Sequence, residues 1–190
     1  MRRFPIFMLP ILLVIIACSD STGPSGPEPE GEIIAQGTVD SQGGILGGDA
    51  IMLDVPAGAF GGDAQLMLRT APEQPFDDAA AADPYWIIGL PSEFSDDLTV
   101  SLAATGDISD STCLAVGMET WVPSLNETET VYRYFPATVA DGVITGTIPA
   151  TAELKARKPS DIQADEQTTI SVTAVTGMGP YTTPEGHFKI

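Results

Sequence analysis

Histidine is almost absent from this chain of 190 residues, in which His187 is the one example. A metal site built from several histidines is therefore excluded, and so is a histidine-based catalytic triad. No run of residues matches a nucleophile elbow, a phosphate-binding loop or a metalloprotease helix. These absences predict a protein that is not an enzyme and that has no catalytic residues, no metal ligands and no cofactor.

Basic residues are scarce as well, with 8 Lys and Arg against 26 Asp and Glu and a formal net charge of −18. An acidic surface repels phosphate backbones and anionic lipid head groups. Nucleic acid is thereby excluded as a partner. In a secreted protein such a charge most often serves solubility or adaptation to salt.

Cysteine is limited to Cys18 and Cys113, which rules out a framework of several disulfide bonds. Cys113 is followed by the apolar run Leu114-Ala115-Val116. This context predicts a buried structural thiol rather than a nucleophile, because nucleophilic thiols lie in accessible, electropositive surroundings.

Long hydrophobic runs are also lacking. The run at residues 4–16 is too short to cross a bilayer as a permanent helix, which needs about 20 apolar residues. It follows Arg2 and Arg3 and has the length of a secretory signal core. The sequence therefore predicts a signal peptide over residues 1–17.

The apolar run closes on Ile15-Ile16-Ala17-Cys18, which resembles the lipobox of bacterial lipoproteins. The resemblance implies that Cys18 is lipidated, with palmitate among its acyl chains, and becomes the first residue of the mature chain. Two or three acyl chains hold a protein on a membrane almost permanently. An ordinary signal peptide that contains an incidental cysteine is the alternative.

The residues after Cys18 refine the predicted location. In enterobacteria an aspartate directly after the lipidated cysteine resembles an inner-membrane retention signal, so Ser19 favours the outer membrane, with the domain facing the periplasm or the cell surface.

Residues 18–32 are rich in Pro, Gly and Glu. They predict a disordered tether that reaches roughly 40 Å at about 3.1 Å per residue. The membrane, held through the lipid, is thus one predicted partner.

Apolar and polar residues alternate from residue 33 onward. The period of two predicts half-buried strands. Turn sequences such as Gly61-Gly62-Asp63 and Asp141-Gly142 separate them. Many short strands at spacings of about ten residues predict an all-β fold, an antiparallel β-sandwich over residues 33–155. The alternating segments are residues 51–55, 66–68, 98–102, 114–118 and 170–174.

Three other segments complete the predicted domain organisation. Residues 85–90 are nearly all apolar and predict a central strand that is covered on both faces and ends at Pro91. Residues 131–135 and 142–148 predict a hairpin whose strands are separated by Pro136 and the Asp141-Gly142 turn. Residues 156–190 predict an irregular segment and final strands that can pack on the sandwich.

The stretch from Gly43 to Arg69 carries a second resemblance. A Gly-Gly turn, a strand, the segment Val55-Pro56-Ala57-Gly58-Ala59-Phe60, an acidic Gly turn and a further strand resemble the ZU-5 domain. This domain is the β-module of ankyrins, netrin receptors and zonula occludens protein, and its members are mostly interaction and spacer modules without a cofactor. Pro56 would end the strand ladder, Gly58 would adopt a conformation that other residues disfavour, and Phe60 would return to the core.

One branch of the ZU-5 family cleaves itself at a His-Phe-Ser sequence, and the matching place here reads His187-Phe188-Lys189. A lysine ammonium has no hydroxyl with which to attack the preceding peptide bond. The resemblance therefore does not imply self-cleavage.

Neighbouring acidic residues are candidates for a calcium site, because calcium is a hard ion that prefers six to eight oxygen ligands. The pair Asp107 and Asp110 lacks the spacing of a twelve-residue calcium loop. These acids are predicted to be solvated turn residues. The remaining pairs are Asp77-Asp78, Asp96-Asp97 and Asp165-Glu166.

Taken together, the sequence predicts a lipid-anchored cell-envelope protein that acts as a non-catalytic binding or spacer module. Its partner is expected to be a protein or another envelope component. Two alternatives stay open: an N-terminal accessory domain of a longer envelope hydrolase, and a calcium-dependent adhesin.

Overall fold

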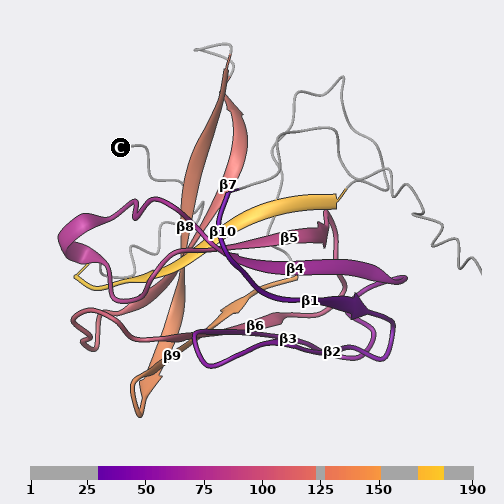
Figure 1. Cartoon of the computed structure of the whole chain (residues 1–190), viewed down its shortest axis with the longest axis horizontal. Coiled ribbons are helices and arrows are strands. Elements are labelled where there is room, and N and C mark those ends of the chain that lie inside the picture. The colour runs from indigo at the N-terminus through magenta and orange to yellow at the C-terminus, as the bar shows by residue number, and fades with distance from the viewer. Residues whose placement is uncertain (1–29, 123–126, 151–166, 178–190) are drawn as a thin grey trace, which may run out of the picture.

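The computed structural model describes residues 30–122, 127–150 and 167–177 (Figure 1). These residues form a 10-stranded sheet and one short 3-10 helix, η1 (Asp77–Ala79). All of the strand pairings are antiparallel. The predicted all-β, antiparallel sandwich is confirmed. The described residues contain no helix that is long and apolar enough to cross a membrane.

The sheet folds over into two facing layers, which Figure 1 shows one above the other. Four strands lie in the lower layer in the order β9-β6-β3-β2, and we call it the β6 layer. The other layer has the order β1-β4-β5-β10-β7, and we call it the β10 layer. The strands are β1 (Ile33–Val39), β2 (Gly44–Gly47), β3 (Ile51–Val55), β4 (Ala64–Thr70), β5 (Tyr85–Pro91), β6 (Leu98–Ala103), β7 (Cys113–Val122), β9 (Val143–Ile148) and β10 (Gln167–Val175).

Strand β8 (Glu127–Ala140) belongs to both layers. Its residues from Glu127 to Pro136 pair with β7, and its last residues, Ala137–Ala140, pair with β9. The predicted hairpin is therefore wrong in part, because residues 131–135 pair with β7 and not with residues 142–148. Pro136 does not end the strand. It lies where the pairing changes from one layer to the other, a place where a missing N–H costs little.

The turn between β8 and β9 agrees with its sequence. Asp141 and Gly142 have φ angles of 53° and 76°. Positive φ at both central residues is the mark of the tight type I′ hairpin turn, which Asp-Gly sequences favour. The Asp141-Gly142 turn prediction is confirmed.

The inner faces of the two layers enclose one core. In β3, Ile51, Leu53 and Val55 are buried while Met52 and Asp54 are exposed, as the alternation predicts. Complete burial of one aliphatic side chain contributes roughly 1.5–3 kcal/mol to the free energy of unfolding. The largest fully buried side chains are Phe60, Ile51, Leu53, Leu66, Leu68, Ile87, Leu90, Leu98, Leu102, Leu114, Ile144 and Ile148.

The segment after β3 has the predicted physical roles. The strand ends at Val55, directly before Pro56. Gly58 has a φ of 84°, and its N–H donates a 2.9 Å hydrogen bond to the carbonyl oxygen of Ser41. Phe60 is buried in the core. The segment therefore ends the strand and turns the chain so that Phe60 enters the core, as expected from its proline, glycine and phenylalanine.

The strand covered most completely on both faces is β10. It lies between β5 and β7, and every residue from Ile170 to Val175 is buried. β5 is central as predicted, between β4 and β10, but Trp86 and Ile88 on its outer side are only half-buried. The last described strand is thus a full member of the sandwich. The irregular segment predicted before it lies outside the described residues.

Candidate binding face

The outer face of the β6 layer is the candidate binding surface. Directly paired residues of neighbouring strands share a face of a sheet. The side opposite the core is rich in threonine and serine, and we call it the hydroxyl face. Its residues are Ile45, Gly47, Met52, Asp54, Thr99, Ser101, Ala103, Thr138, Ala140, Val143, Thr145 and Thr147.

Hydroxyl groups line up across the strands of this face. Ser101 of β6 pairs with Thr145 of β9, which pairs in turn with Thr138 of β8. The Ser101 and Thr145 hydroxyls share a 3.1 Å hydrogen bond. Thr99 pairs with Thr147 one rung further along. Each hydroxyl has one donor and two acceptor positions, so the row keeps unused capacity for a bound molecule.

Exposed apolar side chains lie on the hydroxyl face, Met52 beside Ser101 and two others, Ile45 and Val143, on the outer strands β2 and β9. Ile45 is 67% exposed, Met52 39% and Val143 40%. These three belong to the five large hydrophobic residues that are exposed in the described part of the chain. They lie on three different rungs, and burial of each would stabilise contact with another surface.

The charge of the hydroxyl face is low for this protein. Asp54 is the one charged residue among the strand positions that define the face. The whole chain has a formal net charge of −18, so acidic residues gather elsewhere on the surface. A partner therefore meets one carboxylate among the strand positions of this face.

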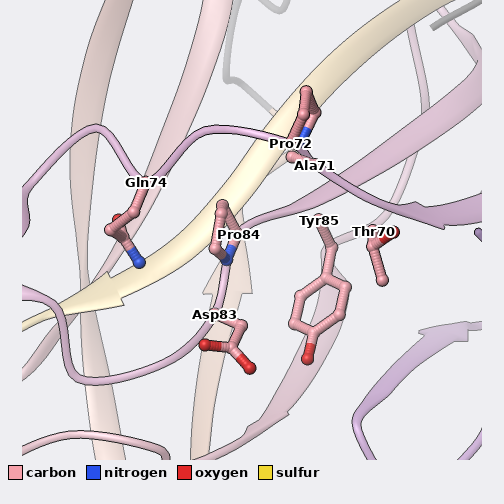
Figure 2. A pocket seen from close by; sticks show the side chains of 7 residues that line it. All are labelled: Thr70, Ala71, Pro72, Gln74, Asp83, Pro84 and Tyr85. Atoms are coloured by element: carbon pink, nitrogen blue, oxygen red, sulfur yellow. The ribbon is translucent and has the colours of Figure 1, made fainter. Parts of the chain in front are cut away.

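A second feature is a hollow of about 270 Å³ beside the loop from β4 to β5 (Figure 2). Two of its polar side chains, Gln74 and Asp83, help to hold that loop, while Gln74 Oε1 is buried without a hydrogen-bond partner among the described residues. Gln74 Nε2 donates to the carbonyl oxygen of Ala82 at 3.1 Å, and Thr105 Oγ1 donates to Asp83 Oδ1 at 3.1 Å. Burial, and then the charge of Asp83, raise the pKa of Tyr85. The lining residues are Thr70, Ala71, Pro72, Gln74, Asp83, Pro84 and Tyr85.

Chemically, the hollow offers a carboxylate, a phenol, an amide and a hydroxyl but neither a histidine nor a lysine. A phenol with a raised pKa stays protonated near neutral pH and makes a poor base. Thr70 Oγ1 already accepts a 2.8 Å hydrogen bond from the Glu32 N–H. The residues of the hollow are therefore better suited to connecting chain segments than to acid–base catalysis.

The outer face of the β10 layer is covered in one part, around Cys113, Ala115 and Val175, whereas Gln36, Thr38 and Gln65 on β1 and β4 are exposed. Phe76, from the loop between β4 and β5, packs on Tyr132 with ring centroids 4.8 Å apart. Together with Tyr134 these rings pack against buried Cys113, Ala115 and Val175. Burial raises the pKa of the Cys113 thiol to about 11. The prediction of a buried structural thiol is confirmed.

The predicted turn acids lie at the surface in the described residues. Asp96 and Asp97 are exposed, and Asp97 Oδ1 accepts a 2.9 Å hydrogen bond from the N–H of Ala150. Asp107 and Asp110 are also exposed. Over residues 30–122, 127–150 and 167–177, no three histidine, cysteine or acidic side chains gather closely enough to hold a metal ion.

The predicted signal peptide, Cys18, Ser19 and the segment His187-Phe188-Lys189 lie outside the described residues. The acidic pair Asp165-Glu166 lies outside them too. Comparison of the chain with models of protein families and with curated proteins found no match. The lipobox and ZU-5 resemblances stay predictions.

The hydroxyl face was not anticipated from the sequence. Its signal is present in the outward positions of β6 and β9, where Thr99, Ser101, Thr145 and Thr147 alternate with buried residues. Alternation alone does not show that β6 and β9 are neighbours, since 39 residues separate the two strands. The pairing of strands creates the face.

Proposed function

We propose that this chain is a lipid-anchored protein of the cell envelope, on the outer membrane, and that it acts as a non-catalytic binding or spacer module. Cys18 carries the lipid, and the hydroxyl face makes the contact. The observation that carries the proposal is the hydroxyl face: an open sheet surface with exposed hydroxyl and apolar side chains.

The N-terminal sequence supports the anchor. A cationic start, an apolar run and Ile15-Ile16-Ala17-Cys18 occur together in the order of a lipoprotein signal. Residues 18–32 have the composition of a tether. At roughly 40 Å of reach, the tether is longer than a small domain is wide, so the domain can turn any face toward a neighbour.

The architecture supports a binding or spacer role. Two layers that share β8 make a rigid body, and a rigid body keeps a sheet face in shape for recognition. Thr70, Gln74 Nε2 and Asp83 in the hollow make internal hydrogen bonds. The segment Val55 to Phe60 has the roles that the ZU-5 resemblance implies, and members of that family are mostly interaction and spacer modules.

Labelled palmitate tests the anchor. Cells that express the full chain are grown with the label, and the protein is isolated from the envelope. Label should enter the natural protein and be lost in Cys18→Ala, while Cys113→Ala, which alters the other cysteine, should keep it. Equal labelling of the natural protein and Cys18→Ala would refute the anchor.

Methionine oxidation tests the contact face in intact envelopes. Met52 lies on the hydroxyl face, and Met67 lies half-buried on the outer face of the β10 layer. Peroxide oxidation of each is followed by mass spectrometry in envelopes and in dilute purified protein. We expect several-fold protection of Met52 in envelopes and an unchanged rate at Met67. An unchanged rate at Met52 contradicts the assignment of this face.

A further inference from the structure

We propose that residues 185–190 of this chain add to the free edge of β8 as a further antiparallel strand. In the proposed register, Glu185 lies opposite Arg133 and Lys189 lies opposite Glu129. Three observations support the added strand: an edge of β8 that no described strand covers, the direction in which the chain leaves β10, and the charges of the two segments. The added strand depends neither on the lipid anchor nor on the hydroxyl face.

The first part of β8 has a partner on one side. Residues Glu127–Pro136 pair with β7, whereas β9 pairs with Ala137–Ala140. Among the described residues, no strand pairs with the second edge of Glu127–Pro136. In Figure 1, β7 and β8 rise side by side above the rest of the sandwich. An edge of this length carries a row of N–H and C=O groups that can pair with another strand.

The geometry of β8 indicates which backbone groups point to the free edge. A two-residue turn is closed by a hydrogen-bonded pair, so the N–H and C=O of Ala140 point toward β9. This direction alternates along a strand, and neither ladder of β8 contains a register shift. Tyr132 and Tyr134 therefore point their backbone groups to the same side, which is the free edge. Pro136 faces that edge too, so its missing N–H does not interrupt the ladder with β7.

The chain leaves β10 on the side of this edge. β10 ends at Val175, which pairs with Cys113 of β7, and Cys113 pairs in turn with Pro136 of β8. Gly177 has a φ of 81°, and its N–H donates a 3.2 Å hydrogen bond to Ser111 Oγ, shortly before β7 begins. The chain therefore turns toward β7, and β8 is the next strand beyond it.

The segment after Gly177 is long enough to reach the free edge and to run back along it. A position beside Tyr132 is three strand spacings of about 4.8 Å from β10 and about six residues of 3.3 Å back along the sheet, roughly 24 Å in all. The chain from Gly177 to Gly186 can span about 30 Å. Since β8 and β10 are both antiparallel to β7, a segment that turns back runs antiparallel to β8.

Charge selects one register for that segment. Glu129 and Arg133 are four residues apart in β8, and Glu185 and Lys189 are four residues apart near the C-terminus. Antiparallel pairing of Glu185 with Arg133 also sets Lys189 opposite Glu129. Opposite charges that face one another on neighbouring strands stabilise a sheet, and like charges destabilise it. A shift by two residues in either direction keeps at most one such pair, and parallel pairing would set like charges opposite one another.

The other residues of the segment suit this register. Gly186 would lie opposite Tyr132, whose ring already needs a glycine on its other side, because a Cβ at Gly117 would lie 2.6 Å from Cε1 of Tyr132. Phe188 would share the outer face of the β10 layer with Tyr132. Pro184 comes directly before the ladder, where a missing N–H costs little.

A second copy of the chain fits the edge less well. Two β8 strands could also pair Glu129 with Arg133, but each chain has a formal net charge of −18, and the two bodies repel one another. The C-terminal segment is tethered to the edge, which gives it a high effective concentration there. Pairing with a second copy is therefore an outcome of the test.

A disulfide between Val131→Cys and His187→Cys tests the register in the full chain. These positions would form a non-hydrogen-bonded pair with Cα atoms about 4.5 Å apart, which a disulfide can bridge. Mild oxidation should link them within one chain, and mass spectrometry of a digest identifies the linked peptides. The control joins His187→Cys with Ile45→Cys, at a position on β2 that is 67% exposed, and should give about tenfold less product.

Amide hydrogen exchange at Tyr132 gives an independent measurement. In the natural chain this N–H should be protected by the added strand. Arg133→Glu sets two carboxylates opposite one another and should speed exchange about fivefold, and the further change Glu185→Arg should restore it to within about twofold. The control Gln65→Glu adds a carboxylate at an exposed position of β4 and should leave exchange at Tyr132 within about twofold.

A link between positions 131 and 187 within one chain, together with rescue by Glu185→Arg, supports the added strand. Equal yields from the test pair and the control pair overturn it. Unprotected exchange at Tyr132 in the natural chain overturns it as well, and this measurement needs no variant. A linked product of twice the chain mass assigns the edge to a second copy and overturns pairing within one chain. Palmitate labelling and the protection of Met52 test the proposed function separately.

Discussion

The two outer faces of the sandwich differ in how deeply their serine and threonine side chains are buried. On the β10 layer, Ser171 is 3% exposed and Thr173 is fully buried, although both point away from the core. On the β6 layer, the outward Thr138 and Thr147 are exposed. The covered hydroxyl side chains hold the fold together, whereas those of Thr138 and Thr147 are accessible to a partner. The position of a serine or threonine, and not its type, decides its role here.

Placing a charge on each face should produce the largest contrast. Ser171→Asp buries a carboxylate beside Tyr132, with which Ser171 shares a hydrogen bond, and should lower the free energy of unfolding by about 3–5 kcal/mol. Ser101→Asp on the half-buried hydroxyl face should cost about 1 kcal/mol or less. Urea unfolding of the full chain in neutral detergent measures both. Equal losses would show that the hydroxyl face is covered too.

Adding bulk should give the next largest difference. A Cβ at Gly117 would lie 2.6 Å from Cε1 of Tyr132, so Gly117→Val must displace that ring from its place on the β10 layer. Such overpacking typically costs about 1–3 kcal/mol. The control Ala103→Val adds two methyl groups to the hydroxyl face and should change stability by about 0.5 kcal/mol or less. Thermal unfolding that ranks the two variants the other way would contradict the description of the faces.

Removing one hydroxyl from each face should have a smaller effect. Thr173 Oγ1 donates a buried 2.7 Å hydrogen bond to the carbonyl oxygen of Ala82, which also accepts from Gln74. Thr173→Val should therefore cost about 1–2 kcal/mol. Thr145→Val on the open face should be neutral within about 0.5 kcal/mol when unfolding is measured at low protein concentration. A neutral Thr173→Val would show that the loop is held by other contacts.

The smallest effect concerns alkaline pH and the covered thiol. Burial raises the pKa of Cys113 from 9.0 to about 11 in the folded chain. The folded state thus holds the proton more tightly, so this contribution to stability is complete below about pH 9 and is lost as pH rises through 11. The natural chain should lose more stability than Cys113→Ala between pH 8 and pH 10.5, as followed by urea midpoints. Tyr85 and Tyr132 also have raised pKa values and contribute equally to both proteins. The pKa of Tyr134 is raised by burial and then by the charge of Cys113, so this part of its contribution disappears with the thiol. Parallel curves would contradict the assignment.

Local patterns predicted much of the fold but little of the candidate site. Ile51, Leu53 and Val55 show their inward direction in the sequence because a half-buried strand repeats every two residues. The Gly44–Gly47 strand shows no alternation, since two of its four residues are glycines. Pro136 misled the prediction because proline commonly ends a strand, whereas here it stands where β8 changes partners.

The hydroxyl face depends on which strands become neighbours. Ser101 meets Thr145 only after the chain has placed β9 beside β6, 44 residues further along. Pairings of this kind are decided by the packing of the whole core, which no local window contains. The covered face depends on a distant contact as well, since Phe76 reaches Tyr132 across the outer side of the sheet. The pattern of a strand shows which side chains share one of its faces, and strand pairing decides which of them become neighbours.

The dual membership of β8 has a mechanical consequence. Because one unbroken strand is hydrogen-bonded to β7 along its first part and to β9 along its last part, the two layers cannot slide or part without tearing a ladder. The domain should therefore unfold in a single cooperative event, with both layers lost together rather than one after the other.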